Sequence, residues 1–306
     1  MNNKIYIASR VREGGIYTYE YADGIYKMLF FTQMDSPMYM IMSDKKMHIL
    51  LRSPFDNDKS GLISYDVAEK GELINPGEIL STKGQIACHL AKIDNCIYCV
   101  NYTSGSVIKM PDSLVIHKGN AISHTHYVGP TPDNKYIFVT DLGLDEIYIY
   151  DKNLNLFNKI KMPIGHGVRH LVASKDGKYI FTANELKSTV SVLKYNDGNL
   201  ELLDTIKTIP NDKKSAPSAI RLYKEHIYVS NRFHDSISKL SFDGSKLFLR
   251  DNFSCMGKTP RDFIFDDNRI ICANQDDDSV TVFQEQSDNS FKHIQTINIA
   301  EPICII

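Results

Sequence analysis

Short hydrophobic segments recur along the chain at nearly regular intervals, each preceded by a turn rich in Asp, Gly or Asn and followed by Ser or Asn. One apolar residue anchors each segment, and successive anchors lie 44, 48, 40, 43, 47 and 43 residues apart: Ile5, Ile49, Ile97, Ile137, Ile180, Ile227 and Ile270. A period in the forties that is built from short strands is typical of a β-propeller with one four-stranded blade per repeat. The pattern therefore predicts an all-β fold, a seven-bladed β-propeller.

The fifth repeat shows the expected strands of one blade most clearly. Residues 169–173 (RHLVA) are apolar enough for an inner strand, and residues 175–178 (KDGK) are typical of a hairpin turn. The sequences of residues 179–183 (YIFTA), 189–193 (TVSVL) and 200–208 predict the other three strands, with polar turns between them. The chain shows no helical periodicity of useful length between its repeats.

The two ends of the chain read as complementary pieces of one blade. Residues 4–8 match a second strand of the repeat, and residues 301–305 match a first strand. If both pieces share one blade, the ring closes and no propeller edge is left unpaired. Seven repeats of about 43 residues use nearly the whole chain, so we expect a single domain over residues 1–306.

Composition and charge limit the kinds of binding partner and the cellular location that we expect. The chain is 42% hydrophobic and 24% charged, and its net charge of -2 offers no general attraction to nucleic acid or to an acidic membrane surface. The first ten residues lack a basic stretch followed by an apolar run, and no segment approaches the roughly 20 apolar residues of a membrane span. We expect a cytoplasmic protein without nucleic-acid or membrane partners, as a monomer or a weak homo-oligomer.

Six cysteines raise the question of disulfides or a metal site. Without a secretory signal, reduced thiols are the expectation. Cys96 and Cys99 form a CxxC pattern inside an expected strand, where residues three apart face opposite sides. This geometry favours buried thiols over a metal or redox pair.

Aligning the repeats on their anchors gives two columns of residues that we expect at one rim of the central channel. The first column lies just before the inner strands: Met38, Cys88, His126, Arg169, Ser218, Arg261 and Ile303. The second column follows the second strands: Arg10, Pro54, Tyr102, Leu142, Glu185, Arg232 and Gln275. Because these two strands run antiparallel, the start of one and the end of the next lie at the same rim.

Four arginines, one carboxylate and one histidine are expected at this mouth: Arg10, Arg169, Arg232, Arg261, Glu185 and His126. Guanidinium groups that converge in a partly enclosed space are costly unless an anion lies among them. Their planar fork suits a carboxylate or a phosphate, and histidine can carry a proton near neutral pH. The set predicts a small anionic ligand and acid–base chemistry.

Structural roles explain several of these residues equally well when each is taken alone. A single arginine could pair with Glu185, or with Asp262 beside Arg261. His89, His124 and His170 are more typical of packing or hydrogen-bonding residues than of catalysts. A column of Asn101, Asn184, Asn231 and Asn274, with Asp141, fits turn chemistry. The functional interpretation therefore depends on the coincidence of positions at one rim.

The same positions carry a resemblance to a known family. The matching phrases are residues 124–128 (HTHYV) with 131–133 (TPD), 167–170 (GVRH), 184–186 (NEL), 230–232 (SNR), 260–263 (PRDF), 273–275 (ANQ), 87–89 (ACH) and 101–102 (NY). With these phrases the chain resembles the seven-bladed lactonase propellers, which include cytosolic 6-phosphogluconolactonases and fungal carboxymuconate cyclases. One departure is Val168, where the family usually has proline.

The resemblance implies roles for individual residues. It places catalysis on His126, Glu185 and Arg169, with Arg232 as the second arginine of the set and Arg261 as the other candidate for that place. Substrate contacts are expected from these residues: Arg232, Arg261, Arg10, Tyr102, His89 and Gln275. No metal and no cofactor is implied.

The leading hypothesis is hydrolysis of an anionic sugar-acid lactone, with 6-phosphogluconolactone as the best match. His126, alone or with Glu185, would activate water, and Arg169 would stabilise the oxyanion. A carboxymuconate-type cyclase uses the same groups and stays open. A metal-dependent lactonase would need several oxygen ligands where arginines stand. A non-catalytic binding propeller is a further alternative because a fold does not determine function. Against it, the Trp-Asp motif that recurs in scaffold propellers is absent, since the chain has no Trp.

Overall fold

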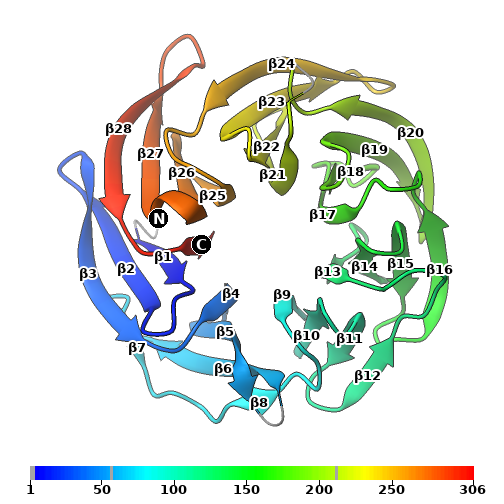
Figure 1. Cartoon of the computed structure of the whole chain (residues 1–306), viewed down its shortest axis with the longest axis horizontal. Helices are drawn as coiled ribbons and strands as arrows, with labels where there is room; N and C mark the ends of the chain where they lie inside the picture. Colours follow the sequence, from blue (N-terminus) through cyan, green and yellow to red (C-terminus); the bar gives the residue numbers. More distant parts are fainter. Residues whose placement is uncertain (1–3, 56–57, 211–212) are drawn as a thin grey trace.

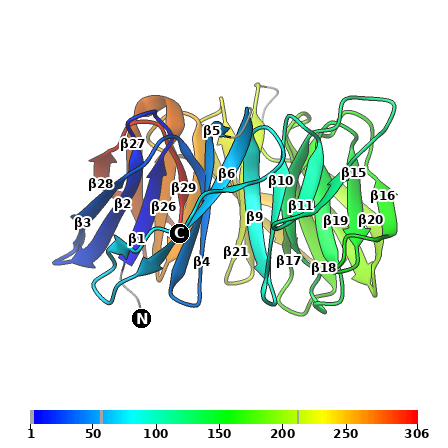
Figure 2. The same cartoon turned by 90° about the horizontal axis from the view of Figure 1, so that it is seen from below.

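The computed structural model describes residues 4–55, 58–210 and 213–306, with the backbone alone at residues 53–55. Its strands form seven sheets that stand around a central axis as the blades of a closed ring (Figure 1). Seen edge-on, the innermost strands cross the thickness of the ring (Figure 2). The prediction of an all-β, seven-bladed propeller is confirmed.

Blades are numbered here along the chain, and their strands are given from the axis outward. Blade 1 contains β29 (Pro302–Ile305), β1 (Lys4–Ser9), β2 (Gly15–Ala22) and β3 (Ile25–Gln33). Blade 2 contains β4 (Pro37–Ser43), β5 (Lys46–Phe55) and β6 (Lys59–Val67), and the short strands β7 (Leu73–Ile74) and β8 (Leu80–Ser81) both pair with β6. Blade 3 contains β9 (Ala87–Ile93), β10 (Cys96–Asn101), β11 (Ser106–Lys109) and β12 (Ser113–Ile116).

The remaining four blades repeat this plan. Blade 4 contains β13 (Thr125–Pro130), β14 (Ile137–Asp141), β15 (Glu146–Tyr150) and β16 (Leu156–Lys161). Blade 5 contains β17 (Val168–Ala173), β18 (Tyr179–Asn184), β19 (Thr189–Asn196) and β20 (Asn199–Lys207). Blade 6 contains β21 (Ala216–Tyr223), β22 (His226–Arg232), β23 (Ser236–Phe242) and β24 (Leu247–Ser254). Blade 7 contains β25 (Pro260–Asp266), β26 (Arg269–Asn274), the 3-10 helix η1 (Gln275–Asp277), β27 (Ser279–Glu285) and β28 (Phe291–Asn298).

Blade 1 closes the ring with strands from both ends of the chain. β1 pairs with β2 on one side and with β29 on the other, where Ile7 lies opposite Ile305 and Ala8 opposite Cys304. The predicted closure by N-terminal and C-terminal strands is therefore confirmed. The two ends of the chain are thereby held together in one sheet, which closes the ring.

The core of the described chain lies between the blades. Buried apolar side chains form seven clusters, and the members of each come mainly from two neighbouring blades. Val107 of blade 3 and Val139 of blade 4 share one cluster, while Ile7 of blade 1 and Val282 of blade 7 share another. Strand residues alternate between the two faces of a sheet, so each blade can pack on both of its neighbours.

All six cysteines are free thiols, and five of them are buried. Within the described residues, no helix has the length and apolar character needed to cross a lipid bilayer.

In four blades an asparagine of the column connects strands within the sheet, a role that the sequence did not predict, whereas Asp141 of blade 4 has the predicted role in a turn because its Oδ1 accepts from the N–H of Leu144. Asn184 is fully buried, and its Nδ2 donates to Thr189 Oγ1 at 3.1 Å and to Ser191 Oγ at 2.8 Å on the third strand. In blade 4 the same position is Asp141, which accepts hydrogen bonds from His117 and Ser123. Burial opposes ionisation of Asp141, but these hydrogen bonds outweigh it and hold its pKa below the ordinary value.

Candidate functional site

Near the start of every innermost strand, the pairing with the second strand is interrupted by a β-bulge. The residues left without a partner are Met38, Cys88, His126, Arg169, Arg261 and Ile303 in six blades, and Ser218 with Ala219 in blade 6. A bulge bends the strand and redirects the side chain of the extra residue. These positions are the first sequence column, and they lie inside the strands at the bulge instead of just before them.

The second column is fixed to the same rim by the backbone. The N–H of Glu185 donates to Gly167 O at 2.8 Å, and the N–H of Tyr102 donates to Ile86 O at 2.8 Å. In each case the acceptor directly precedes an innermost strand. Two side chains per blade, one from each column, therefore meet at one end of the central channel.

Blade 2 departs from the alignment made on the sequence. There the N–H of Arg52 donates to Ser36 O at 2.9 Å, so Arg52 occupies the second column. The strand pairing shows the reason. In blade 3, Leu90 of the inner strand lies opposite Cys99, which is two residues after the anchor Ile97. The equivalent inner-strand residue of blade 2 is Met40, and it lies opposite Ile49, so Ile49 corresponds to Cys99 and is not the anchor. The anchor of blade 2 is therefore Met47, not Ile49.

This correction replaces one predicted column member by a residue that the sequence did not single out. Pro54 was the predicted member, and its side chain lies outside the described part of the chain. A shift of two residues keeps every strand side chain on the same face, so the hydrophobic pattern alone cannot detect it. Spacing does not separate the two residues either, because Pro54 lies five residues after Ile49 just as Arg52 lies five residues after Met47.

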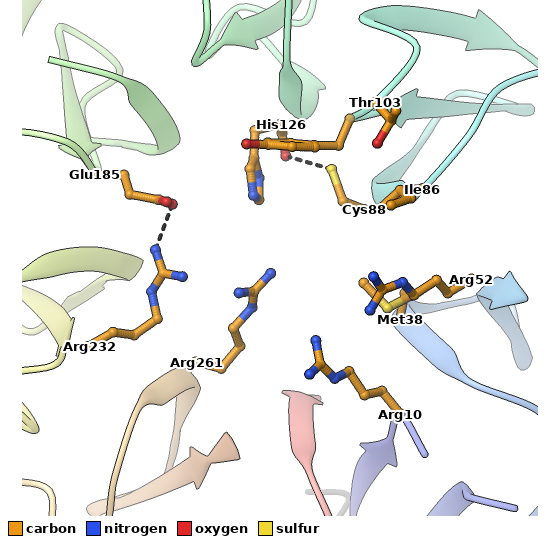
Figure 3. A pocket seen from close by; sticks show the side chains of 11 residues that line it. Arg10, Met38, Arg52, Ile86, Cys88, Thr103, His126, Glu185, Arg232 and Arg261 are labelled. Atoms are coloured by element: carbon orange, nitrogen blue, oxygen red, sulfur yellow. Dashed lines mark hydrogen bonds and ion pairs between the residues drawn. The ribbon is translucent and has the colours of Figure 1, made fainter. Parts of the chain in front are cut away.

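A cavity of about 220 Å³ opens where the two columns meet (Figure 3). Eleven residues line it: Arg10, Met38, Arg52, Ile86, Cys88, Tyr102, Thr103, His126, Glu185, Arg232 and Arg261. Six of these were predicted from the sequence as site residues: Arg10, Tyr102, His126, Glu185, Arg232 and Arg261. The structure brings these six together from blades 1, 3, 4, 5, 6 and 7.

Glu185 is held between two arginines. Its Oε2 lies 2.6 Å from Arg232 Nη2 and 3.2 Å from Arg169 Nε. Each arginine is also anchored to the backbone, since Arg169 Nη1 donates to Ser218 O and Arg232 Nε donates to Ala216 O. Arg169 is buried and is not among the residues that line the cavity, although its charge acts on His126 and Cys88.

The other arginines differ in how far their charge is compensated. Arg10 Nε lies 2.5 Å from Glu301 Oε2. Asp262, the neighbour that could have neutralised Arg261, pairs instead with Arg221 at 2.6 Å. Within the described residues, the guanidinium groups of Arg261 and Arg52 have no hydrogen-bond or ion-pair partner. Five guanidinium groups therefore surround the site with two carboxylates, which leaves an excess of positive charge for an anion.

Burial and mutual repulsion act on these cations without discharging them. Burial, together with the charges of Arg261 and Arg232, lowers the pKa of Arg169 to about 9. Burial and the charges of Arg232 and Arg10 lower the pKa of Arg261 to about 10. Both values stay above neutral pH, so both guanidinium groups remain charged there.

His126 presents a neutral imidazole to the cavity. The residue is 4% exposed, and its ring lies edge-on to Tyr102 at 5.7 Å and to His170 at 5.2 Å between centroids. Burial, and then the charges of Arg169 and Arg261, hold the pKa of His126 well below its ordinary value. A neutral imidazole in an electropositive cavity can accept a proton from water that is polarised by a bound substrate.

Two predicted substrate contacts lie elsewhere. His89 lies between Tyr39 and Tyr127 with its ring tilted against both, at 4.3 and 4.5 Å between ring centroids, and lines a separate cavity of about 450 Å³ farther along the inner strands. It follows the bulged residue Cys88 and therefore points away from the first cavity. Gln275 begins η1, and its Nε2 donates to Asp276 Oδ1 at 2.9 Å; it does not line the first cavity.

Cys88 is the thiol closest to the proposed chemistry, since it lines the same cavity as His126. Burial raises the pKa of its thiol to about 12. The nucleophilic form of cysteine is the thiolate, which is scarce at neutral pH when the pKa is this high. Cys88 therefore forms part of the wall of the cavity.

Within the described ranges, no group of three or more His, Cys, Asp or Glu side chains has an arrangement that suits a metal. The polar groups of the cavity are mainly cationic, which suits an anionic ligand.

The chain is similar in sequence and in structure to several known proteins. A protein of Staphylococcus aureus strain N315, named only as uncharacterised, is 29% identical over 90% of this chain and 89% of its own length. The crystal structure of a Lactobacillus plantarum protein superposes with a TM-score of 0.88 at 25% identity, covering 100% of this chain and 99% of the other. A Bacteroides fragilis protein provisionally named 6-phosphogluconolactonase superposes with a TM-score of 0.90 at 24% identity, covering 99% and 97%.

A family model settles the classification, because it spans almost the whole chain. The model describes a lactonase with a seven-bladed β-propeller, and it matches residues 4–306. The chain belongs to this lactonase family of seven-bladed propellers.

Proposed function

We propose that this protein hydrolyses an anionic sugar-acid lactone, with 6-phosphogluconolactone as the best-matching substrate. The observation that carries the proposal is the neutral imidazole of His126 in a cavity whose other walls carry uncompensated guanidinium groups. Such a cavity combines a base with sites for the negative charge of the substrate and of the transition state. Membership of the lactonase family supports the same reaction class.

In the proposed reaction, His126 accepts a proton from a water molecule as the oxygen of that water attacks the lactone carbonyl carbon. The carbonyl oxygen becomes an oxyanion, which Arg232 stabilises by an interaction of about 3 kcal/mol. The tetrahedral intermediate then collapses, the bond from the carbonyl carbon to the ring oxygen breaks, and the imidazolium returns its proton to the leaving oxygen. The product is an open-chain hydroxy acid, which loses a proton to solvent at neutral pH.

The geometry changes the role expected for Arg169. The sequence pointed to it as the oxyanion stabiliser, but it pairs with Glu185 and is not among the residues that line the cavity. In this proposal Arg169 is a positioning residue that holds Glu185, and Glu185 in turn orients Arg232. Arg261, which has no carboxylate partner among the described residues, faces the charged group of the substrate.

The test is the loss of freshly generated 6-phosphogluconolactone, measured against its spontaneous hydrolysis. Acceleration by the purified protein is the expected result. A parallel measurement with carboxymuconate and its lactone separates the hydrolase from the cyclase alternative, because the cyclase would interconvert these two compounds. A folded protein that accelerates neither reaction would contradict the proposal and favour a non-catalytic binding propeller.

The pH dependence of hydrolysis follows from the low pKa of His126. A general base acts in its neutral form, and a pKa held below 6.5 by burial and neighbouring arginines keeps that form populated in mildly acidic solution. We therefore expect kcat/KM to stay level as the pH falls from about 8 to below 6.5, and to decline only in more acidic solution. A bound anionic substrate offsets the arginine charges and raises the pKa of His126, so the acidic decline of kcat should lie at higher pH. A kcat/KM profile whose acidic limb is centred at 6.5 or above would contradict this assignment.

A further inference from the structure

The cavity beside His126 adjoins a second one, and Arg52 lines both. The second cavity has a volume of about 630 Å³ and extends outward over blades 1, 2 and 3. The two share four lining residues, which are Arg10, Arg52, Ile86 and Thr103. Arg52 and His126 both line the first cavity, so one ligand in that cavity can contact both.

Charge is distributed unevenly between the two sides of this site. On the side of Glu185, the carboxylate already compensates Arg169 and Arg232. On the other side, Arg261 and Arg52 lack partners within the described chain, and the partner of Arg10 is the half-exposed Glu301. Figure 3 shows the side chains of Arg10, Arg52 and Arg261 pointing into the cavity across from His126. Three guanidinium groups that face one space are best satisfied by a group with two negative charges.

We propose that Arg52, Arg10 and Arg261 form a subsite for a phosphate monoester, and that Arg52 determines specificity for phosphorylated over unphosphorylated lactones. The inference rests on the proposed lactonase function for the reaction, but the phosphate subsite itself is a separate claim about binding. A phosphate held by these arginines leaves the lactone ring on the side of His126 and Glu185, where the water attack takes place. Guanidinium groups bind phosphate through paired N–H donors, which fixes the orientation of the substrate as well as its charge.

The first experiment compares two substrates with the Arg52→Ala variant. The ratio of kcat/KM for 6-phosphogluconolactone to kcat/KM for glucono-1,5-lactone should fall about tenfold, as expected for the loss of one charged hydrogen-bond donor pair. The ratio for Arg52→Lys should lie between those of the wild type and Arg52→Ala, because lysine keeps the charge but lacks the planar guanidinium group. Arg12→Ala is the matched control, since Arg12 is exposed, lines only the outer cavity and removes the same charge. The control should leave the ratio within twofold of the wild-type value.

The second experiment measures binding without turnover. Calorimetric titration with inorganic phosphate should give a dissociation constant about tenfold larger for Arg52→Ala than for the wild type, and an unchanged dissociation constant for Arg12→Ala. If phosphate binding depends on Arg52 but no lactone is hydrolysed, the subsite stands and the proposed function fails. If lactones are hydrolysed and Arg52→Ala changes neither the substrate ratio nor phosphate binding, the subsite is overturned. Equal losses with Arg52→Ala and Arg12→Ala would also overturn it, because they would indicate only a general effect of positive charge.

Discussion

Replacing His126 by alanine is expected to lower kcat/KM for lactone hydrolysis by about 10²- to 10⁴-fold, the range that a positioned general base contributes. The imidazole is the neutral basic side chain that faces the cavity among its described lining residues, and the nearby carboxylate of Glu185 is occupied by two arginines. Water attack without His126 would have to proceed without proton removal. Steady-state hydrolysis of the lactone, corrected for the spontaneous rate, measures the effect.

A second variant separates catalysis from packing at this buried position. His126→Gln keeps most of the side-chain volume but cannot accept a proton at neutral pH, so it should lose as much activity as His126→Ala with a smaller change in thermal stability. His293→Ala is a suitable control because His293 lies partly exposed on the outer strand β28 and does not line the cavity. Full activity in His126→Gln would show that His126 has a structural role and that another group accepts the proton.

Glu185→Gln is expected to lower the free energy of unfolding by about 3 kcal/mol, at the low end of the cost of breaking a buried ion pair. The glutamine keeps the shape of the side chain but leaves Arg169 and Arg232 without a compensating charge. Both guanidinium groups are anchored to backbone carbonyl oxygens of blade 6, so neither can move to solvent without breaking a hydrogen bond. The Glu185 side chain is 20% exposed, and this partial hydration is why the low end of the range applies. Denaturant titration of both proteins measures the difference.

The matched control for this effect is Glu301→Gln. Glu301 also pairs with an arginine of the cavity, Arg10, but its side chain is 40% exposed, so water compensates most of the loss. We expect a change below 1 kcal/mol for this exposed pair. Added phosphate should restore more stability to Glu185→Gln than to the wild type, because an anion can replace the missing charge in the folded state alone. Equal destabilisation by the two substitutions would contradict the view that Glu185 neutralises buried arginines.

Much of the site could be predicted because the repeat converts sequence position into spatial position. Residues at one offset from each anchor occur at one rim of the ring, so His126, Glu185, Arg232 and Arg261 could be grouped before any contact was known. The bulges of the inner strands gave the grouping its physical basis, since each redirects a side chain at the same place in its blade. The alignment missed Arg52 because strand periodicity is blind to a shift of two residues.

The sequence could not show which arginines have an ion-pair partner and which lack one. Asp262 follows Arg261 directly in the chain, but successive strand residues face opposite sides, and Asp262 of blade 7 pairs with Arg221 of blade 6. Arg169 and Arg232 are far apart in sequence, yet they share one carboxylate oxygen. These choices depend on distances of a few ångströms between different blades.

By itself, the sequence determined the seven-bladed ring, its closure by the two chain ends and the rim at which polar residues gather, because these follow from local hydrophobic patterns repeated at a regular interval. Only the tertiary structure decided the position of Arg52 in blade 2, the sharing of Glu185 by two arginines and the place of His89 in a separate cavity. The physical reason is that ion pairs and burial arise between blades, where the packing of one strand against another sets which charges meet.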